Sequence, residues 1–361
     1  MINVVIDNVA FTIQKIGGIS VVWYEIINRL LRDQSIDVRF VECPNAKENY
    51  YRKRLDIDNK VFRKIRKSWF KIIRYINPRF GIKYPYIFHS TYYRVSRDRT
   101  AINFTTVHDF TYERSGSKSI ATRVHIWQQK QAVLKSDYVV CISENTKRDL
   151  LHYYPEVDQE KIHVIYNGVS EEYKKLENLN VKCLPFEPLS YCIYVGVRRS
   201  YKNYNLAVES IAKTNYNLVI VGSPLSDKER IYLNNTIGEG RYQCFSKVPN
   251  EKLNEFYNGA FALLYLSSYE GFGIPCIEAQ KAGCPVVALN ASSIPEVVCD
   301  NNLLIDYPTH ENVVLKLKKL EDSSYRKEIV DKGIKFASMF SWNRTYKELT
   351  DLYNKALHAT Q

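Results

Sequence analysis

The stretch AFALLYLSSYEGFGIPCIEAQKAGCPVVALN, residues 260–290, reads as a complete strand–loop–helix–strand unit. Its first seven residues form an apolar run that predicts a buried strand, and PVVALN at 285–290 predicts the next one. Between them, Pro275 falls in the first turn of a predicted helix and Gly283 just past its end, where each residue is favoured. A loop that joins a buried strand to a helix N-terminus is a common ligand site in α/β proteins. The unit therefore predicts a parallel sheet and a candidate binding loop together.

The same alternation of short apolar runs and helical patterns continues along the chain. The N-terminal half predicts strands at 3–6, 38–42, 86–91, 102–109, 138–143 and 162–168. A second series predicts strands at 191–196, 217–222, 242–248, 260–266, 285–290 and 302–306. A polar link at 170–188 separates the two series, and residues 309–358 are helical in pattern. This arrangement predicts two parallel sheets, each covered by helices on both faces, rather than one sheet of a dozen strands.

Length and composition agree with a two-domain globular protein. A chain of 361 residues is long for one core, and 45% hydrophobic with 25% charged residues is ordinary for a folded domain. The eight cysteines show no CxxC spacing, and Cys141 and Cys192 lie in predicted strands, so we expect buried free thiols in a reducing compartment. The sequence starts directly with a strand pattern, and no apolar stretch approaches the roughly 18 residues of a membrane-spanning helix. We therefore expect a cytoplasmic protein.

The positive charge is concentrated in one segment. A net charge of +12 predicts a polyanionic partner, and residues 52–74 carry ten Lys or Arg against only Asp56 and Asp58. Six apolar residues there fall on one helical face, predicting a basic amphipathic helix: Val61, Ile65, Trp69, Ile72, Ile73 and Ile76. Such a helix either lies on an anionic bilayer, here as a peripheral contact of residues 52–76 at the inner face of the membrane, or packs its apolar face on a sheet. No nucleic-acid-binding motif accompanies the charge, so we expect no nucleic acid partner.

The chemistry of the loop EGFG and the helix after it suits a nucleotide sugar. Gly271 and Gly273 allow the backbone to approach a ligand, and the helix N-terminus favours anionic groups. Glu278, one turn into the helix, can accept hydrogen bonds from a ribose diol, and Glu270 can hold sugar hydroxyls or oppose positive charge on a sugar ring. The chemistry alone also allows Glu278 to be a helix-dipole partner and Glu270 a solvated turn residue.

SSYEGFGIPCIEAQKAGCPVVALNASSIPEV, residues 267–297, resembles the signature of the retaining, nucleotide-sugar-dependent glycosyltransferases of family four, which have the GT-B fold. The resemblance implies that Glu278 binds the ribose and that Glu270 is a catalytic residue facing the transferred sugar. It also implies a set of donor-binding residues at the start of the helix: Gly271, Phe272, Gly273 and Ile274.

The segment YVGVRRSYKN, residues 194–203, resembles the part of this family that carries basic residues onto the donor diphosphate. A pyrophosphate needs cations held by a rigid base, and a loop at a strand end supplies one. The resemblance implies catalytic roles for Lys202 and Arg198, with Arg199 as the alternative arginine, and places Asn203 at the donor site. The other interpretation is a solvated basic loop.

Two segments of the N-terminal half also resemble the family. KIGGIS, residues 15–20, matches its glycine-rich loop, which implies that Gly17 and Gly18 approach the diphosphate and the acceptor. TTVHDF, residues 105–110, matches its strand-end histidine, which implies that His108 lies near the donor sugar as a catalytic residue. In addition, Asp56 and Asp58 have the spacing by which the other main glycosyltransferase fold holds a divalent metal, but we interpret this pair as a chance occurrence and expect no metal or cofactor.

The resemblance implies two facing Rossmann-like, doubly wound α/β domains with a cleft between them. Residues 1–170 would bind the acceptor, residues 171–342 the nucleotide sugar of UDP or GDP type, and a helix at 343–361 would return to the first domain. The implied activity is metal-independent, retaining hexosyl transfer to a saccharide or a lipid-linked saccharide in polysaccharide or glycolipid synthesis. The alternatives are a sugar-nucleotide epimerase or phosphorylase of the same fold, or a non-catalytic nucleotide-sugar-binding protein.

Overall fold

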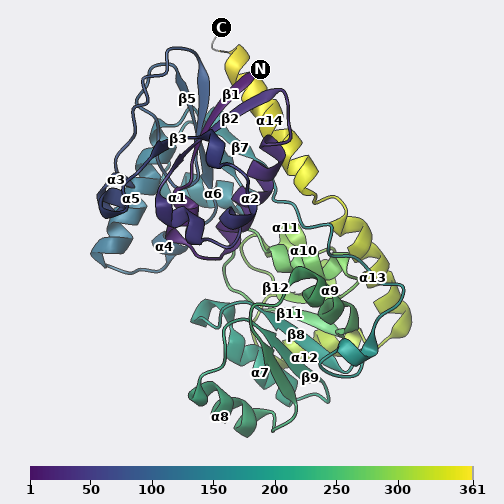
Figure 1. Cartoon of the computed structure of the whole chain (residues 1–361). Coiled ribbons are helices and arrows are strands. Elements are labelled where there is room, and N and C mark those ends of the chain that lie inside the picture. The colour runs from purple at the N-terminus through teal and green to yellow at the C-terminus, as the bar shows by residue number, and fades with distance from the viewer. Residues whose placement is uncertain (360–361) are drawn as a thin grey trace. The chain divides into compact units, whose positions relative to one another are not determined.

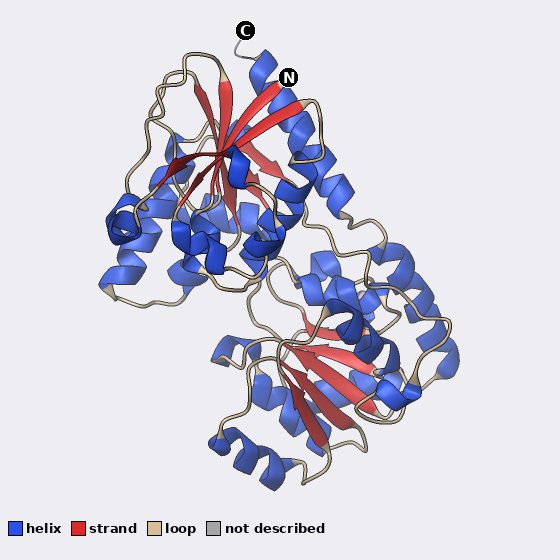
Figure 2. Ribbon diagram, in the orientation of Figure 1, coloured by secondary structure: helices blue, strands red, loops and turns tan. Residues whose placement is uncertain are grey.

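The computed structural model describes residues 1–359, apart from the side chains of Pro44 and Lys71, and it divides into two compact units (Figure 1). The N-terminal unit comprises Met1–Asn167 together with the chain from Trp342 onward, and the C-terminal unit comprises Gly168–Ser341. Each unit contains one parallel sheet with helices packed against it (Figure 2), so the predicted α/β class with two sheets is confirmed.

The sheet of the N-terminal unit has seven parallel strands in the order β3-β2-β1-β4-β5-β6-β7. They are β1 (Ile2–Asp7), β2 (Ile36–Glu42), β3 (Val61–Lys64), β4 (Tyr86–Ser90), β5 (Ala101–Val107), β6 (Tyr138–Cys141) and β7 (Ile162–Val164). All but β3 overlap segments that the sequence predicts as strands. The order reverses between β1 and β4, so the carboxyl ends of these strands form a switch point, the place where open α/β sheets bind ligands.

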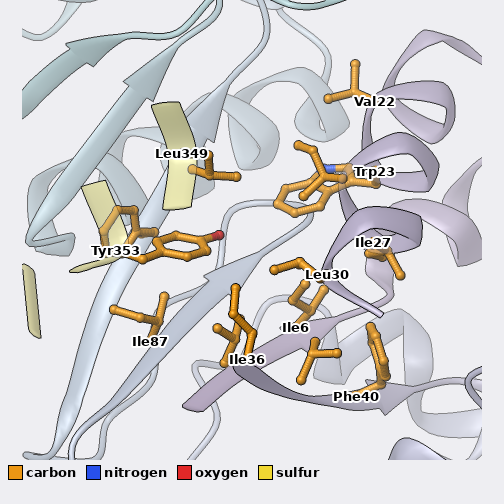
Figure 3. Close-up of a cluster of buried hydrophobic side chains, with 14 of the residues drawn as sticks. Ile6, Val22, Trp23, Ile27, Leu30, Ile36, Phe40, Ile87, Leu349 and Tyr353 are labelled. Carbon is orange, nitrogen blue, oxygen red and sulfur yellow. The ribbon is translucent and has the colours of Figure 1, made fainter. Parts of the chain in front are cut away.

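Both faces of this sheet are buried. Val4 of β1 belongs to one core, whereas its neighbour Val5 belongs to the core on the opposite face. The helices of the unit are α1 (Val9–Ile13), α2 (Gly18–Leu30), α3 (Phe70–Ile73), α4 (Thr111–Arg114), α5 (Ile120–Lys135), α6 (Glu144–Tyr153) and α14 (Trp342–His358). Figure 3 shows the first core, in which Trp23 of α2 and Leu349 and Tyr353 of α14 lie over the strands. The last helix of the chain therefore completes the core of the N-terminal unit.

The amphipathic helix predicted over residues 61–76 is not present, and this prediction is wrong. The segment begins as the edge strand β3, which pairs in parallel with β2, and continues through a short turn into the four-residue helix α3. Ile65 and Ile73 pack into the second core, while Trp69, Ile72 and Ile76 are exposed. The apolar positions fit a helical period in the sequence, but pairing with β2 and packing on the core divide them between two environments.

The sheet of the C-terminal unit has six parallel strands in the order β10-β9-β8-β11-β12-β13. They are β8 (Tyr191–Val195), β9 (Asn217–Val221), β10 (Tyr242–Phe245), β11 (Ala262–Tyr265), β12 (Val286–Leu289) and β13 (Leu304–Ile305), all within predicted segments. The helices are α7 (Tyr204–Ala212), α8 (Asp227–Thr236), α9 (Asn250–Gly259), α10 (Ile274–Lys281), α11 (Ile294–Val297), α12 (His310–Lys319) and α13 (Ser323–Ala337). The order reverses between β8 and β11, which makes this the switch point of the second sheet.

Two further predictions concern cysteines and membrane spans. All eight cysteines are free thiols, and five of them, including Cys141 and Cys192, are buried as predicted, whereas Cys183 is exposed and Cys244 and Cys299 are partly exposed. Burial raises the pKa of Cys284 to about 12. Within residues 1–359, no helix combines the length and the apolar content that crossing a bilayer requires.

Candidate active site

The loops that follow β8 and β11 are tied together at the switch point of the C-terminal unit. Asn203 adopts a left-handed backbone conformation (φ 48°) at the start of α7, and its Nδ2 donates to the carbonyl oxygen of Leu266 at 2.8 Å. The backbone N–H of Ser268 donates to the carbonyl oxygen of Tyr201, also at 2.8 Å. These bonds hold the segment with Lys202 against the segment with Glu270, although 68 residues separate the two side chains in the sequence.

Lys202 and Glu270 form an ion pair at this point. Their side chains are only 12% and 15% exposed, so the pair is shielded from solvent yet reachable. The Lys202 ammonium also lies 5.2 Å from the centre of the Tyr265 ring, which adds a cation–π contact. The structure therefore brings together two of the residues that the sequence predicts as catalytic.

Two serines that the sequence analysis did not single out hold the Glu270 loop. The backbone N–H of Glu270 donates to Ser292 Oγ at 2.8 Å. Ser293 Oγ donates to the carbonyl oxygens of Glu270 and Phe272, both at 2.9 Å. Both serines follow β12, the strand next to β11, so a polar pair at the end of a neighbouring strand was the signal that could have identified them.

The helix α10 starts at a residue that must be glycine. Gly273 has φ 104°, a conformation that side chains rarely adopt, and a Cβ there would come within 3.2 Å of Val297. No side chain caps this helix, which leaves its N-terminal end suited to an anionic ligand group. Phe272 is buried with its ring against Phe340, so only its backbone faces the loop, and Ile274 is partly buried at the first helical position.

Glu278 lies one turn into α10 with its carboxyl in a buried environment. Tyr257, itself fully buried, donates from its hydroxyl to Glu278 Oε2 at 3.3 Å. Burial raises the pKa of Glu278 to about 7, and hydrogen bonds from Tyr173 and Tyr257 limit the rise. The folded protein thus keeps a carboxyl group with two tyrosine donors in a place where its charged form is disfavoured.

Arg198 points to a different partner. Its Nε lies 2.5 Å from Glu229 Oε1, and its Nη1 and Nη2 each donate at 2.8 Å to the carbonyl oxygens of Ser223 and Pro224. Its hydrogen bond holds the pKa of Glu229 at about 2. Arg199 is exposed and its side chain has no hydrogen bond or ion pair with the described residues. In this structure the predicted diphosphate arginine is therefore engaged within its own unit, and Lys202 is the cation at the Glu270 loop.

The residues predicted in the N-terminal half belong to the other unit. Gly17 and Gly18 open α2, and a Cβ on Gly18 would meet no described atom within 4 Å, so the packing of this unit does not require glycine there. At the switch point of this sheet, Asp7 of β1 accepts from Ser90 Oγ and Arg94 Nε at 2.9 and 2.7 Å. This buried cluster was not predicted from the sequence.

His108 follows β5 directly and is buried. Its Nε2 has no hydrogen-bond partner among the described residues, and burial lowers its pKa to about 4, which makes the ring neutral at pH 7. Asp109, the next residue, accepts from the backbone N–H of Thr111 at 2.9 Å. A second histidine, His89, is also buried, but both of its ring nitrogens have partners, Tyr353 and Thr106. His108 therefore has a buried ring nitrogen without a protein partner at a strand end, and among the described residues His163 of β7 has one as well.

Asp56 and Asp58 do not form a common ligand set. Asp58 pairs with Lys47 and, at 2.8 Å, with Arg52, and these bonds lower the pKa of Asp58 to about 2. Across residues 1–359, no three His, Cys, Asp or Glu side chains are grouped in a way that could hold a metal ion.

Known proteins share both the sequence pattern and the fold. In sequence, an O-antigen chain mannosyltransferase B of Escherichia coli is 24% identical over 287 residues, 74% of either chain. In structure, sucrose-phosphate synthase of Thermosynechococcus elongatus has a TM-score of 0.77 at 17% identity, covering 99% of this chain and 100% of that one. HepE of Anabaena, in complex with UDP and glucose, has a TM-score of 0.72 at 14% identity, covering 98% and 100%. The predicted GT-B fold is therefore confirmed.

Two family models match consecutive parts of the chain. The model of Glycosyltransferase Family 4 matches residues 16–173, which include the glycine-rich loop and His108. The model of Glycosyl transferases group 1 matches residues 158–336, which include Lys202, Glu270 and Glu278. Together they cover residues 16–336, which include every residue predicted for the site, and the chain belongs to the family four glycosyltransferases.

Proposed function

We propose that this protein transfers a hexosyl group from a nucleotide sugar to a hydroxyl group of a saccharide or lipid-linked saccharide, with retention of configuration and without a metal ion. The observation that carries the proposal is the Lys202–Glu270 pair at the switch point, beside the uncapped start of α10 and one turn from the Glu278 carboxyl. A cation, a helix N-terminus without a side-chain cap and a buried carboxyl group suit a diphosphate and a ribose.

Each group has a role in donor binding. The Glu278 carboxylate accepts hydrogen bonds from the two ribose hydroxyls, which supply the partners that favour its charged form. The Lys202 ammonium turns to the diphosphate, and the amides at the start of α10 receive the sugar or phosphate oxygens. Glu270, still held by Ser292 and Ser293 through its backbone, then faces the sugar.

The reaction is a substitution at the anomeric carbon. The bond from that carbon to the diphosphate oxygen breaks, the acceptor oxygen forms its bond on the same face, and the acceptor proton passes to a departing phosphate oxygen. Lys202 stabilises the charge that grows on the leaving group, and Glu270 opposes the positive charge on the ring. Arg198 adds a second cation if it leaves Glu229 on donor binding. His108, neutral with a free Nε2, hydrogen-bonds a sugar hydroxyl, and Gly17 and Gly18 admit the acceptor.

The relatives narrow the substrate class. One is named as an O-antigen chain mannosyltransferase and another was solved with UDP and glucose, so we propose a hexose donor of UDP or GDP type and a polysaccharide or glycolipid pathway. A peripheral contact of residues 52–76 with an anionic membrane belongs to the same proposal. It is supported by the exposed Trp69, Ile72 and Ile76 among basic residues, even though they do not form one helix.

The test is the thermal stability of the protein with UDP, GDP, ADP and CMP, each without and with EDTA. A nucleotide at 100 times its dissociation constant should add about 2.7 kcal/mol of stability. We expect UDP or GDP to do so, and Glu278→Gln to abolish the effect while Glu239→Gln, an exposed glutamate of the same unit, retains it. A stabilisation that is equal in Glu278→Gln, or that EDTA removes, would contradict the proposed donor site.

Turnover separates the transferase from the alternatives. With the nucleotide sugar identified by binding, we expect nucleotide release to depend on an added saccharide acceptor. Equal release of free sugar or epimerised donor without acceptor would indicate an epimerase, and release that depends on inorganic phosphate would indicate a phosphorylase. Binding without any turnover would indicate a nucleotide-sugar-binding protein.

A further inference from the structure

The N-terminal unit contains a cavity that no step of donor binding uses. Its volume is about 480 Å³, and it lies among the end of β2, the strand β3, the loop after α3 and the residue Arg94 that follows β4. Val41, Ile65 and Phe80 form part of its wall, and Trp69 and Ile76 also line it. The cavity is therefore near the carboxyl edge of the sheet, where ligands of parallel sheets bind.

The charge that lines this cavity is of one sign. None of the described lining residues is an acid. Five of them are cations: Arg63, Lys64, Arg66, Arg79 and Arg94. The side chains of Lys64 and Arg66 are exposed and make no hydrogen bond or ion pair with the described residues. Arg79 lies 3.6 Å from Asp98 but is 78% exposed, so that pair neutralises little. The cluster of positive charge predicted from the sequence thus gathers, in part, around one cavity.

Arg94 contributes a buried guanidinium to the lining of the cavity. Its side chain is only 1% exposed, and its Nε pairs with Asp7 at 2.7 Å. Its Nη2 is buried but has no hydrogen-bond partner among the described residues. A buried guanidinium nitrogen without an acceptor is costly, and such groups in native structures call for an explanation. An oxygen atom of a ligand in the cavity would supply the acceptor.

The rim of the cavity is apolar and exposed. Trp69 and Ile76 line the cavity and are 55% and 51% exposed, and Ile72 between them is 59% exposed. Exposed apolar residues that are grouped in this way mark a site for an apolar ligand or partner. A cationic cavity with an apolar rim matches a molecule that has an anionic head and a hydrocarbon chain.

We propose that this cavity binds the phosphate or diphosphate of a single-chain amphiphile, whose hydrocarbon chain lies on Trp69, Ile72 and Ile76. Arg94 Nη2 donates to one phosphate oxygen, which becomes its missing acceptor, and Lys64 and Arg66 neutralise the remaining charge. The proposed binding is argued from the cavity alone. Its biological role rests on the proposed function, because the head group would belong to a lipid that carries the saccharide acceptor.

The experiment is a calorimetric titration of the full chain with farnesyl diphosphate, inorganic pyrophosphate and farnesol at constant ionic strength. We expect farnesyl diphosphate to bind at least tenfold more tightly than the other two. Lys64→Ala/Arg66→Ala should lower that affinity at least tenfold, because both side chains are unpaired and their loss leaves the fold intact. The matched control Lys327→Ala/Lys335→Ala removes the same charge from the surface of α13 and should bind as the unchanged protein does.

A substitution of Arg94 tests the buried donor of the cavity. Arg94→Lys keeps a cation beside Asp7 but removes the planar guanidinium. It should lower the affinity for farnesyl diphosphate several-fold and leave the stabilisation by nucleotide unchanged. Equal loss in both double variants would overturn the proposal as unspecific charge. Binding of pyrophosphate as tight as farnesyl diphosphate would overturn the amphiphile, and binding only to phosphatidylglycerol vesicles would reduce the site to a membrane surface contact. If farnesyl diphosphate binds but no nucleotide stabilises the protein, the proposed ligand of the cavity stands and the proposed function is refuted.

Discussion

At the scale of single residues, the buried carboxyl of Glu278 lowers the stability of the folded protein when it is ionised. Its pKa of about 7 lies above that of an unfolded glutamate, so the folded state binds more protons than the unfolded state between these two values. Stability therefore falls as pH rises through this interval, and the full cost is present above pH 7. We expect Glu278→Gln, which cannot ionise, to be more stable than the unchanged protein by about 1–3 kcal/mol at pH 8.

The pH dependence distinguishes this effect from a general change in packing. The advantage of Glu278→Gln should shrink as pH falls from about 8 towards about 5, measured by urea unfolding across that range. Glu239→Gln, an exposed control, should show no such trend. A difference that does not vary with pH would mean that the carboxyl titrates normally in the folded protein.

Lys202 permits a second prediction at this scale. Its ammonium is expected to contact the diphosphate. Lys202→Ala should therefore weaken the binding of UDP or GDP by about 1.5–3 kcal/mol, about 10- to 100-fold in affinity. The affinity for the matching nucleoside, which has no phosphate, should stay the same. Calorimetric titration with both ligands measures the ratio, and an equal loss for nucleoside and diphosphate would assign Lys202 to folding rather than to phosphate binding.

Sequence reasoning singled out candidate site residues more readily than their partners. Glu270 and Glu278 stand out because one follows a buried strand and the other lies near the start of a helix, whereas Lys202 was chosen because its segment resembles the family. Ser292, Ser293 and Tyr257 touch the same loop and helix only after the sheet has formed, from strands and helices elsewhere in the chain. The serine pair directly after β12 was a local signal, but the loop that it holds depends on the strand order, which the local sequence does not record.

At the scale of elements, Arg198 joins a loop to a helix. Glu229, its partner, also accepts from Ser226 in the capping box that begins α8, so one arginine holds both the helix start and the carbonyls of Ser223 and Pro224. We expect Arg198→Ala to lower the free energy of unfolding by about 1–3 kcal/mol, because it leaves a partly buried carboxylate and two carbonyls without their donor.

Nucleotide binding decides whether Arg198 has a second role. Lys228→Ala, an exposed change on the same helix, is the control for stability. If the affinity of folded Arg198→Ala for UDP or GDP equals that of the control, the arginine is structural, and the diphosphate relies on Lys202. If it falls as in Lys202→Ala, the arginine leaves Glu229 when the donor binds.

The predicted helix at 61–76 shows where local patterns mislead. Apolar residues spaced by three and four favour a helix over a strand, and the strand β3 is only four residues long and lies at the sheet edge. Its pairing with β2 spans the 18 residues 43–60 that connect the two strands, and no periodicity in the sequence reveals such a pairing. Most of the other strands lie between two neighbours in a sheet and have buried apolar runs, and the short edge strands β7, β10 and β13 also lie within predicted segments.

At the scale of the whole molecule, the N-terminal and the C-terminal unit have no core residue in common. The core that includes Trp23 and Leu349 lies in the N-terminal unit, whereas the core that includes Tyr194 and Leu264 lies in the C-terminal unit. Units with separate cores generally unfold in separate steps, so we expect two transitions in differential scanning calorimetry. UDP or GDP, which lacks the sugar that His108 is predicted to contact, should raise the melting temperature of one transition only, because all other predicted contacts except Gly17 and Gly18 are in the C-terminal unit.

A core substitution assigns the transitions. Leu349 is almost fully buried in α14, so Leu349→Ala should cost about 2–4 kcal/mol and lower the transition that the nucleotide does not move. The matched substitution Leu264→Ala, in β11, should lower the transition that the nucleotide raises. Since α14 follows the C-terminal unit in sequence but belongs to the core of the N-terminal unit, this result would also show which unit the last helix stabilises. One transition that all three changes shift alike would mean that the two cores unfold as a single cooperative unit.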